Sequence, residues 1–113
     1  MAIEVIETLI DGTTFYELPY SLDGEDFILR FEWNSQDEHW FFSLYTAAGE
    51  IVPGCSSVRL VKGIFPLWRV RNELRPQGEF VVISDTEEDP GLRTLGTLSS
   101  LMYIPKAEVD ASR

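Results

Sequence analysis

The alternation of apolar and polar residues from Tyr16 to Leu44 constrains the fold of this chain more than any other feature. Apolar residues occupy every second position in three runs: Tyr16, Leu18, Tyr20 and Leu22; Phe27, Leu29, Phe31 and Trp33; Trp40, Phe42 and Leu44. Asp23-Gly24 separates the first two runs, and a polar turn at 34–37 separates the last two. A period of two sends alternate side chains to opposite faces of a strand, and Asp-Gly supplies the positive φ angles of a tight hairpin. The segment is therefore predicted to form a β-meander with an aromatic inner face.

Weaker strand signals lie on both sides of the meander, at 3–10, 51–52, 57–61, 79–84 and 99–104. We expect 79–84 to be a central strand because it is apolar with little alternation, and 62–68 to be irregular with a helical turn at 69–73. Together these signals predict an all-β fold: one small antiparallel β-barrel or β-sandwich of about seven or eight strands, with little helix. The side chains expected to be mostly buried are Leu29, Phe31, Trp33, Trp40, Phe42, Val82 and Met102.

The length of 113 residues suits one domain. We expect residues 1–105 to form a single β domain and residues 106–113, which are polar and aperiodic, to form a flexible C-terminal tail. No apolar run approaches the roughly 20 residues that span a bilayer, and the first residues lack the basic and apolar regions of a signal peptide. The sequence therefore predicts no membrane segment and synthesis in a cytoplasm.

The net charge of −10, from 19 acidic and 9 basic residues, disfavours direct binding to nucleic acid. The same charge suits either solubility or docking against a basic partner. The single cysteine, Cys55, excludes an internal disulfide and a cysteine zinc site, and we expect it to be a small buried thiol.

Chemistry-bearing motifs are scarce. His39 is the only histidine, and its position opposite in phase to Trp40 predicts a side chain that points to solvent. The acidic run 85–89 lacks the ligand spacing of a calcium loop, and neither a Gly-x-Ser-x-Gly elbow nor a phosphate-binding glycine loop is present. The sequence therefore predicts no catalytic residues, no cofactor and no metal.

Aromatic residues also occur outside the core phase of the meander. Phe41 and Tyr45 fall on its opposite face together with Ile28, and an apolar group on the outward face of a sheet indicates a second buried surface. Phe65 and Trp68, on the irregular segment, extend this set. Phe41, Tyr45, Phe65 and Trp68 are therefore the candidate interface residues.

The order of many such positions resembles the small baseplate plug proteins of contractile-tailed bacteriophages over roughly Thr14 to Pro105. The matching positions are Asp23-Gly24-x-x-Phe27-x-Leu29-Arg30-x-x-Trp33-Asn34, Trp40-x-x-x-Leu44, Gly49-x-x-x-x-Gly54 with Ile51, Val58-Arg59-Leu60-Val61-x-Gly63, Pro66-Leu67, Leu74-x-Pro76-x-Gly78-x-Phe80-Val81-Val82, Asp85, Pro90, Leu95-Gly96 and Leu101-x-Tyr103-Ile104-Pro105. The bulky segment 65–68 and the acidic loop after Asp85 depart from the family pattern.

Membership of that family would imply a structural virion protein in the central hub of the tail baseplate, near the end of the tail tube. Its partners would be hub or spike and tail-tube proteins, it would be present in several copies, and it would be made in the host cytoplasm. The resemblance brings no catalytic residues.

Two other functions stay open from the residues alone. A free-standing β-sandwich module that binds a carbohydrate or a peptide would need an exposed aromatic platform. A small acidic inhibitor or immunity-type protein would need its carboxylates gathered on one face, opposite a basic partner.

Overall fold

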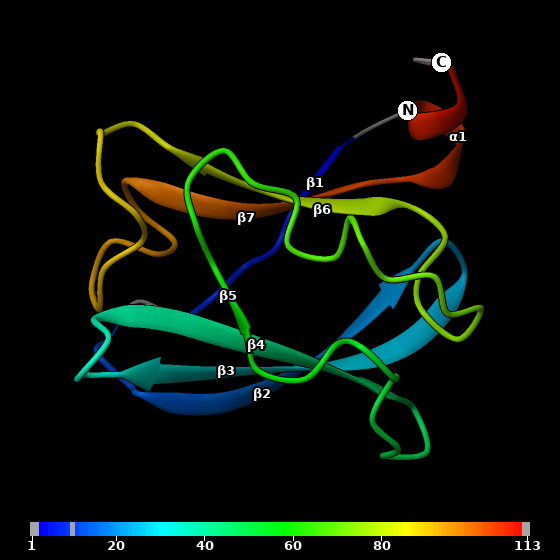
Figure 1. Cartoon of the computed structure of the whole chain (residues 1–113), viewed down its shortest axis with the longest axis horizontal. Coiled ribbons are helices and arrows are strands. Elements are labelled where there is room, and N and C mark those ends of the chain that lie inside the picture. The colour runs from blue at the N-terminus through cyan, green and yellow to red at the C-terminus, as the bar shows by residue number, and fades with distance from the viewer. Residues whose placement is uncertain (1–2, 10, 112–113) are drawn as a thin grey trace.

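The computed structural model describes residues 3–9 and 11–111, which form seven strands, one helix and two antiparallel sheets packed as a sandwich (Figure 1). One sheet has the order β2-β3-β4-β5 and the other the order β1-β7-β6. The strands are β1 (Glu4–Val5), β2 (Phe15–Leu22), β3 (Glu25–Asn34), β4 (His39–Thr46), β5 (Val58–Arg59), β6 (Glu79–Ser84) and β7 (Ser99–Ile104). The prediction of an antiparallel all-β fold with little helix is confirmed, and the sheets form a sandwich without closing into a barrel.

Strands β2, β3 and β4 form the predicted meander. Leu22 pairs with Glu25 around a two-residue turn in which Asp23 has a φ of 52° and Gly24 a φ of 82°. Both angles are those of the turn expected from Asp-Gly, which matches the twist of the two strands. The local sequence is therefore enough to fix the register of this hairpin.

A chain of aromatic contacts runs from the inner face of the meander across the core. The Phe31 and Phe42 ring centroids lie 6.1 Å apart, Phe42 lies 5.3 Å from Phe80 of β6, and Phe80 lies 5.1 Å from Tyr103 of β7. All four side chains are buried. The contacts join the two sheets and account for the aromatic inner face.

The predicted core is correct for Leu29, Phe31, Trp40, Phe42 and Val82, all of which are buried. The other two predicted side chains, Trp33 and Met102, are only partly buried. Trp33 lies in the second-last pair of the β3–β4 ladder, beside the turn that joins the two strands, and it packs against the core. Met102 lies between the buried Leu101 and Tyr103, so it faces away from the core.

Strand β6 is not central, contrary to the prediction, because it lies at the end of its sheet and alternates in burial. Its outer edge is nevertheless paired with the irregular segment. The Gly63 N–H donates to the Val82 carbonyl at 2.8 Å, and the Val82 N–H donates to the Ile64 carbonyl at 3.3 Å. These bonds explain how an edge strand can be almost wholly apolar: another part of the chain covers its edge.

Other boundaries also differ from the predictions. The first strand covers only two residues, with residue 10 outside the described part, and Ile51 forms a single bridge to Tyr45 instead of a strand. The expected helical turn at 69–73 is absent from the described structure. Isolated turns occur there instead, in which the Val70 N–H donates to the Leu67 carbonyl and the Arg75 N–H donates to the Asn72 carbonyl.

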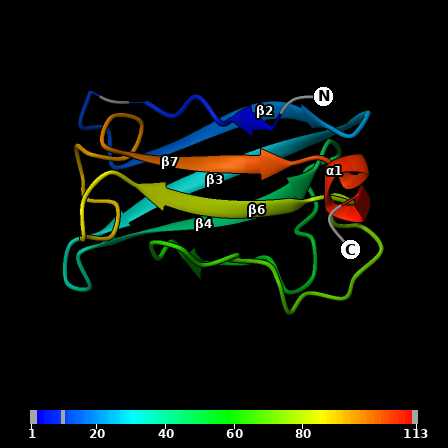
Figure 2. The same cartoon turned by 90° about the horizontal axis from the view of Figure 1, so that it is seen from above.

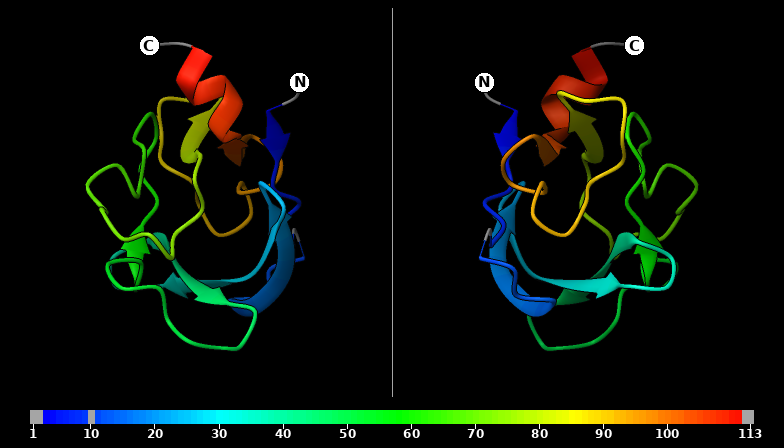
Figure 3. Two further views of the ribbon diagram at one scale, coloured as in Figure 1. Left: turned by 90° about the vertical axis from the view of Figure 1, so that its right-hand side faces the viewer. Right: turned by 90° about the vertical axis from the view of Figure 1, so that its left-hand side faces the viewer.

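Two irregular segments close the open sides of the sandwich. Figures 2 and 3 show the N-terminal residues along the β2 side and the segment 60–78 along the opposite side. On the first side the Tyr20 hydroxyl accepts a hydrogen bond from the Glu7 N–H at 2.5 Å. The two flanks are thus formed by parts of the chain that lie far apart in sequence.

A helix, α1 (Lys106–Ala111), follows β7 and was not predicted. The Asp23 carboxylate accepts hydrogen bonds from the Lys106 N–H, at 3.0 Å, and from the Tyr103 hydroxyl. The β2–β3 turn therefore holds the start of α1 against the three-stranded sheet. Flexibility of 106–113 stays a prediction.

Candidate interaction surfaces

The outer face of the four-stranded sheet carries Tyr45, one of the predicted interface residues. The guanidinium of Arg30 lies 4.7 Å from the centroid of the Tyr45 ring and 5.3 Å from that of the exposed Phe15 ring. Glu17, opposite Arg30 on β2, holds the same guanidinium through oxygen–nitrogen distances of 2.9 Å. The side chains from three adjacent strands thus form one patch in which a cation lies between two rings.

Phe41 lies on the same face of β4 and is half-buried. The Arg59 guanidinium lies 5.9 Å from its ring centroid, and the Asp37 carboxylate fixes this guanidinium through two contacts of 2.9 and 3.1 Å. Phe41 and Tyr45 are therefore each covered in part by an arginine, which makes this face amphipathic. Such surfaces are typical of contacts with proteins, where aromatic and arginine side chains are enriched.

Phe65 and Trp68 lie elsewhere, on the flank formed by the segment 60–78. They line one apolar depression with Gly63 and Ile64, and the exposed fractions of Ile64, Phe65 and Trp68 are 45%, 38% and 51%. The Arg69 guanidinium lies 4.5 Å from the Trp68 ring centroid. The four predicted interface residues therefore belong to two separate surfaces, two on each.

Arg75 organises the segment that carries Phe65 and Trp68. Its guanidinium is buried and donates hydrogen bonds of 2.7 to 3.2 Å to four backbone carbonyls, those of residues 67, 70, 76 and 78. It also lies 3.2 Å from the Glu79 carboxylate. Because a buried polar group is costly unless it is bonded, this one side chain specifies the path of an otherwise irregular segment. Sequence reasoning missed this role, since no local pattern marks it.

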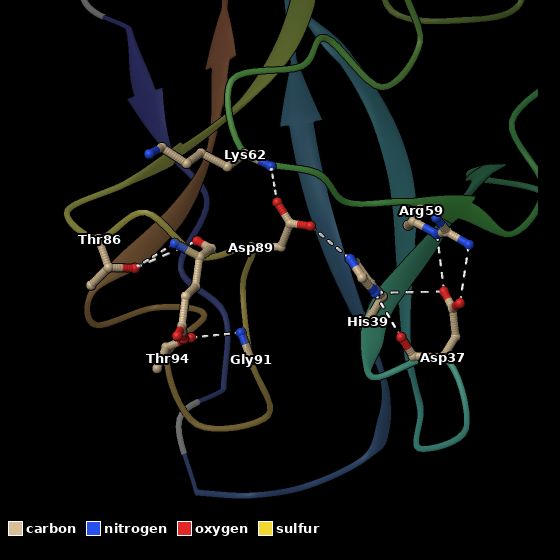
Figure 4. A network of polar contacts seen from close by, with 9 residues as sticks. Asp37, His39, Arg59, Lys62, Thr86, Asp89, Gly91 and Thr94 are labelled. Atoms are coloured by element: carbon tan, nitrogen blue, oxygen red, sulfur yellow. Dashed lines mark hydrogen bonds and ion pairs between the residues drawn. The ribbon is translucent and has the colours of Figure 1, made fainter.

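His39 does not point to solvent, contrary to the prediction, but lies in a polar network (Figure 4). Its Nε2 is 2.7 Å from the Asp89 carboxylate, and its Nδ1 is 2.8 Å from the Asp37 carbonyl oxygen. The sequence pattern predicts the correct face of β4 for the His39 side chain, but the acidic loop 85–89 folds back over this end of the strand and contacts the imidazole ring through Asp89. Asp89 also accepts a hydrogen bond from the Lys62 N–H at 2.9 Å. The network therefore ties the β3–β4 turn and the acidic loop to the segment 60–78.

The protonation states in this network follow from its geometry. Both neighbours of the His39 ring are acceptors, so the ring satisfies both only as an imidazolium with two N–H donors. The bond to the Asp37 carbonyl and then the bond to Asp89 raise the pKa of His39 above its usual 6.5. Burial alone would raise the pKa of Asp89, but the hydrogen bonds from Lys62 and His39 outweigh it and leave that pKa below 3.8.

Cys55 is fully buried, as predicted, and burial raises the pKa of its thiol to about 11. Within residues 3–9 and 11–111, no three His, Cys, Asp or Glu side chains gather in a way that could hold a metal ion. In the same part of the chain, no helix is long and apolar enough to cross a membrane. The absence of catalysis and of a cofactor stays a prediction.

The fold and its surfaces define a class of protein: a small antiparallel β-sandwich with aromatic and arginine side chains gathered on its outside. Residues 5–106 match the family model described as cyanophage baseplate Pam3 plug gp18, and the chain belongs to this family. The resemblance inferred from the order of weak sequence positions is thereby confirmed. A comparison with curated proteins gave no match.

Proposed function

We propose that the chain is a structural plug in the baseplate of a contractile phage tail and acts through contacts with hub or spike proteins and the tail tube. Membership of a baseplate plug family, over residues 5–106, is the observation that carries this proposal. The family supports a structural role in the virion baseplate and association with other baseplate components. Synthesis in the host cytoplasm before assembly belongs to the same proposal.

The two surfaces supply the means of contact. The Phe41 and Tyr45 face presents rings partly covered by arginines, so it is not a bare platform on which a sugar ring could stack. The Phe65 and Trp68 flank presents apolar side chains in a shallow depression. Aromatic and arginine side chains carry much of the binding energy at protein interfaces, so we propose both surfaces as subunit contacts.

Assembly around a tail axis implies several copies, and we propose a repeat of three or six to match the rings of a hub or tube.

Particles assembled without this protein provide the test, scored by electron microscopy of the tube tip and by infectivity. We expect the wild-type chain to restore density at the tip, and the double variant Phe41→Ala/Tyr45→Ala to restore less of it. Ile83→Ala is the matched control, because Ile83 is an exposed apolar residue on β6, outside both surfaces. Complete baseplates with unchanged tip density and infectivity in the absence of the chain would refute the proposal.

A further inference from the structure

Charge is sorted along this sequence in an unusual way. The first 29 residues contain seven acidic residues and no basic one: Glu4, Glu7, Asp11, Glu17, Asp23, Glu25 and Asp26. Residues 51–72 contain four basic residues and no acidic one: Arg59, Lys62, Arg69 and Arg71. A chain with a net charge of −10 therefore contains one continuous cationic stretch.

The fold places parts of these two stretches on opposite flanks of the sandwich (Figures 2 and 3). We call residues 3–9 and 11–17 the acidic flank and residues 62–71 the basic flank. The acidic flank runs along β1 and the edge strand β2, whereas the basic flank runs along the outer edge of β6. Each flank faces away from the other, so they cannot neutralise each other within one molecule.

The charges of the basic flank are available. Within the described part of the chain, Lys62, Arg69 and Arg71 have no carboxylate at ion-pair distance, whereas the neighbouring Arg59 is held by Asp37. Arg69 lies over the Trp68 ring, and the Arg71 guanidinium donates to the Trp68 carbonyl at 3.3 Å. The flank thus presents an exposed indole with one guanidinium group over its ring and a second at its backbone carbonyl, and neither guanidinium group is in an ion pair within the described residues.

The acidic flank is only partly compensated. Glu17 is paired with Arg30, and Arg93 lies against Gly12 and attracts Asp11. Glu4 and Glu7 have no ion pair among the residues that the structure describes.

Exposed apolar side chains accompany both sets of charges. Of the eleven exposed large apolar residues among those that the structure describes, eight lie on these two sides of the molecule: Ile3, Val5, Leu9 and Phe15 on the acidic flank, and Ile64, Phe65, Trp68 and Leu74 on or beside the basic flank. Exposed apolar area next to charges of one sign is typical of surfaces that bind proteins. Burial of the apolar area supplies affinity, and the charges select a partner of opposite charge.

We propose that the basic flank of one copy binds the acidic flank of a second copy. The two surfaces match in charge and both carry exposed apolar side chains, and they belong to the same chain. Because two different patches on opposite flanks meet, the contact is heterologous, and repeating it produces a ring when the rotation between copies closes. This proposal rests on the proposed plug function, because the contact would form between copies in the baseplate. It assigns a second copy of this chain as the partner of the Phe65 and Trp68 surface.

Two charge-reversal variants of the full chain test the contact. Glu4→Lys/Glu7→Lys places two positive charges on the acidic flank and cancels its net charge, and Arg69→Glu/Arg71→Glu turns the net charge of the basic flank negative. We expect the wild-type chain to self-associate at low ionic strength in sedimentation velocity and native mass spectrometry, and each variant alone to associate at least about tenfold more weakly. A one-to-one mixture of the variants restores the matched pairs and should associate again, in species that contain both chains.

The matched control is Glu87→Lys/Glu88→Lys, which changes the net charge by the same amount as the first variant but lies in the exposed acidic loop. It should self-associate like the wild type. Thermal unfolding of each variant shows whether it is folded, and the recovery of association in the mixture could not come from unfolded chains.

A wild-type chain that stays monomeric up to millimolar concentration, variants that associate as well as the wild type, or a mixture that gains nothing would each overturn the inference. Virion incorporation separates it from the plug function. A monomeric Arg69→Glu/Arg71→Glu chain that still enters baseplates normally would show that another baseplate protein covers the basic flank, and would leave the plug function standing.

Discussion

Replacing Trp40 by alanine should be among the most destabilising single changes in this protein. The Trp40 side chain is 1% exposed, and its ring centroid lies 5.6 Å from that of Trp33 and 5.9 Å from that of Tyr16. Its Nε1–H donates to the Gly91 carbonyl at 2.9 Å, which joins the meander to the loop before β7. The truncation therefore removes a large core side chain and one hydrogen bond.

The expected loss is about 4 to 6 kcal/mol, because truncating a buried aromatic costs about 3 to 5 kcal/mol and an unpaired carbonyl adds about 1 kcal/mol. A domain of this size has roughly 5 to 15 kcal/mol in total, so the variant will be close to unfolding. Trp40→Phe keeps most of the ring but loses the bond to Gly91, and should retain a measurable transition with a loss of about 1 to 3 kcal/mol.

Urea denaturation followed by circular dichroism measures these differences, and Trp68→Ala is the matched control. Trp68 is 51% exposed, so removing the same side chain there should change the free energy of unfolding by less than about 1 kcal/mol. If the alanine variants at 40 and 68 were equally stable, the assignment of Trp40 to the core would be wrong.

Three further outcomes follow from other contacts. Gly78→Ala should lower the free energy of unfolding by more than about 3 kcal/mol, because a Cβ there would lie 2.0 Å from the last carbonyl oxygen of β7. The control Gly24→Ala meets nothing within 4 Å and should cost only about 1 kcal/mol, for its positive φ. Thermal melts compare the two variants. Arg75→Lys should lower the free energy of unfolding measured in urea by about 2 to 3 kcal/mol, because an ammonium has only three donors and no planar fork to reach four carbonyls and a carboxylate. A change of less than about 0.5 kcal/mol would refute the structural role of the guanidinium. The His39 pairing should stabilise the wild type fully below the unfolded-state pKa of 6.5 and lose this effect as pH rises through the higher folded-state pKa. Because the pKa of Asp89 is lowered, the stabilisation from Asp89 should be lost only as pH falls below about 3.8. The difference in free energy of unfolding between wild type and His39→Gln should therefore be largest between these two limits. A difference that does not change from pH 5 to 9 would contradict this prediction.

The meander could be predicted from the sequence because its signals are local. The period of two and the Asp-Gly turn act within a few residues, and they fixed the strands, the first hairpin and the inward phase of Phe31 and Phe42. The same reasoning placed Phe41 and Tyr45 correctly on the outer face.

The candidate interface was predicted only in part. Phe65 and Trp68 were expected to extend the Phe41 and Tyr45 face, but they line a separate depression with Gly63 and Ile64. The segment that carries them has no repeating pattern, and its path depends on hydrogen bonds from Arg75 to carbonyls as far as eight residues away. Local sequence patterns do not predict hydrogen bonds of this kind.

The sequence by itself determined the class of fold, the three-stranded meander, the buried thiol and, through the order of many weak positions, the family. Tertiary structure alone decided that His39 is enclosed by the acidic loop, that the edge of β6 is covered by residues 63–64, and that the acidic and basic stretches lie on opposite flanks. The physical reason is the range of the forces. Alternation and turn geometry depend on adjacent residues, whereas burial, ion pairing and the relative position of surfaces depend on which distant segments the packed sheets bring together.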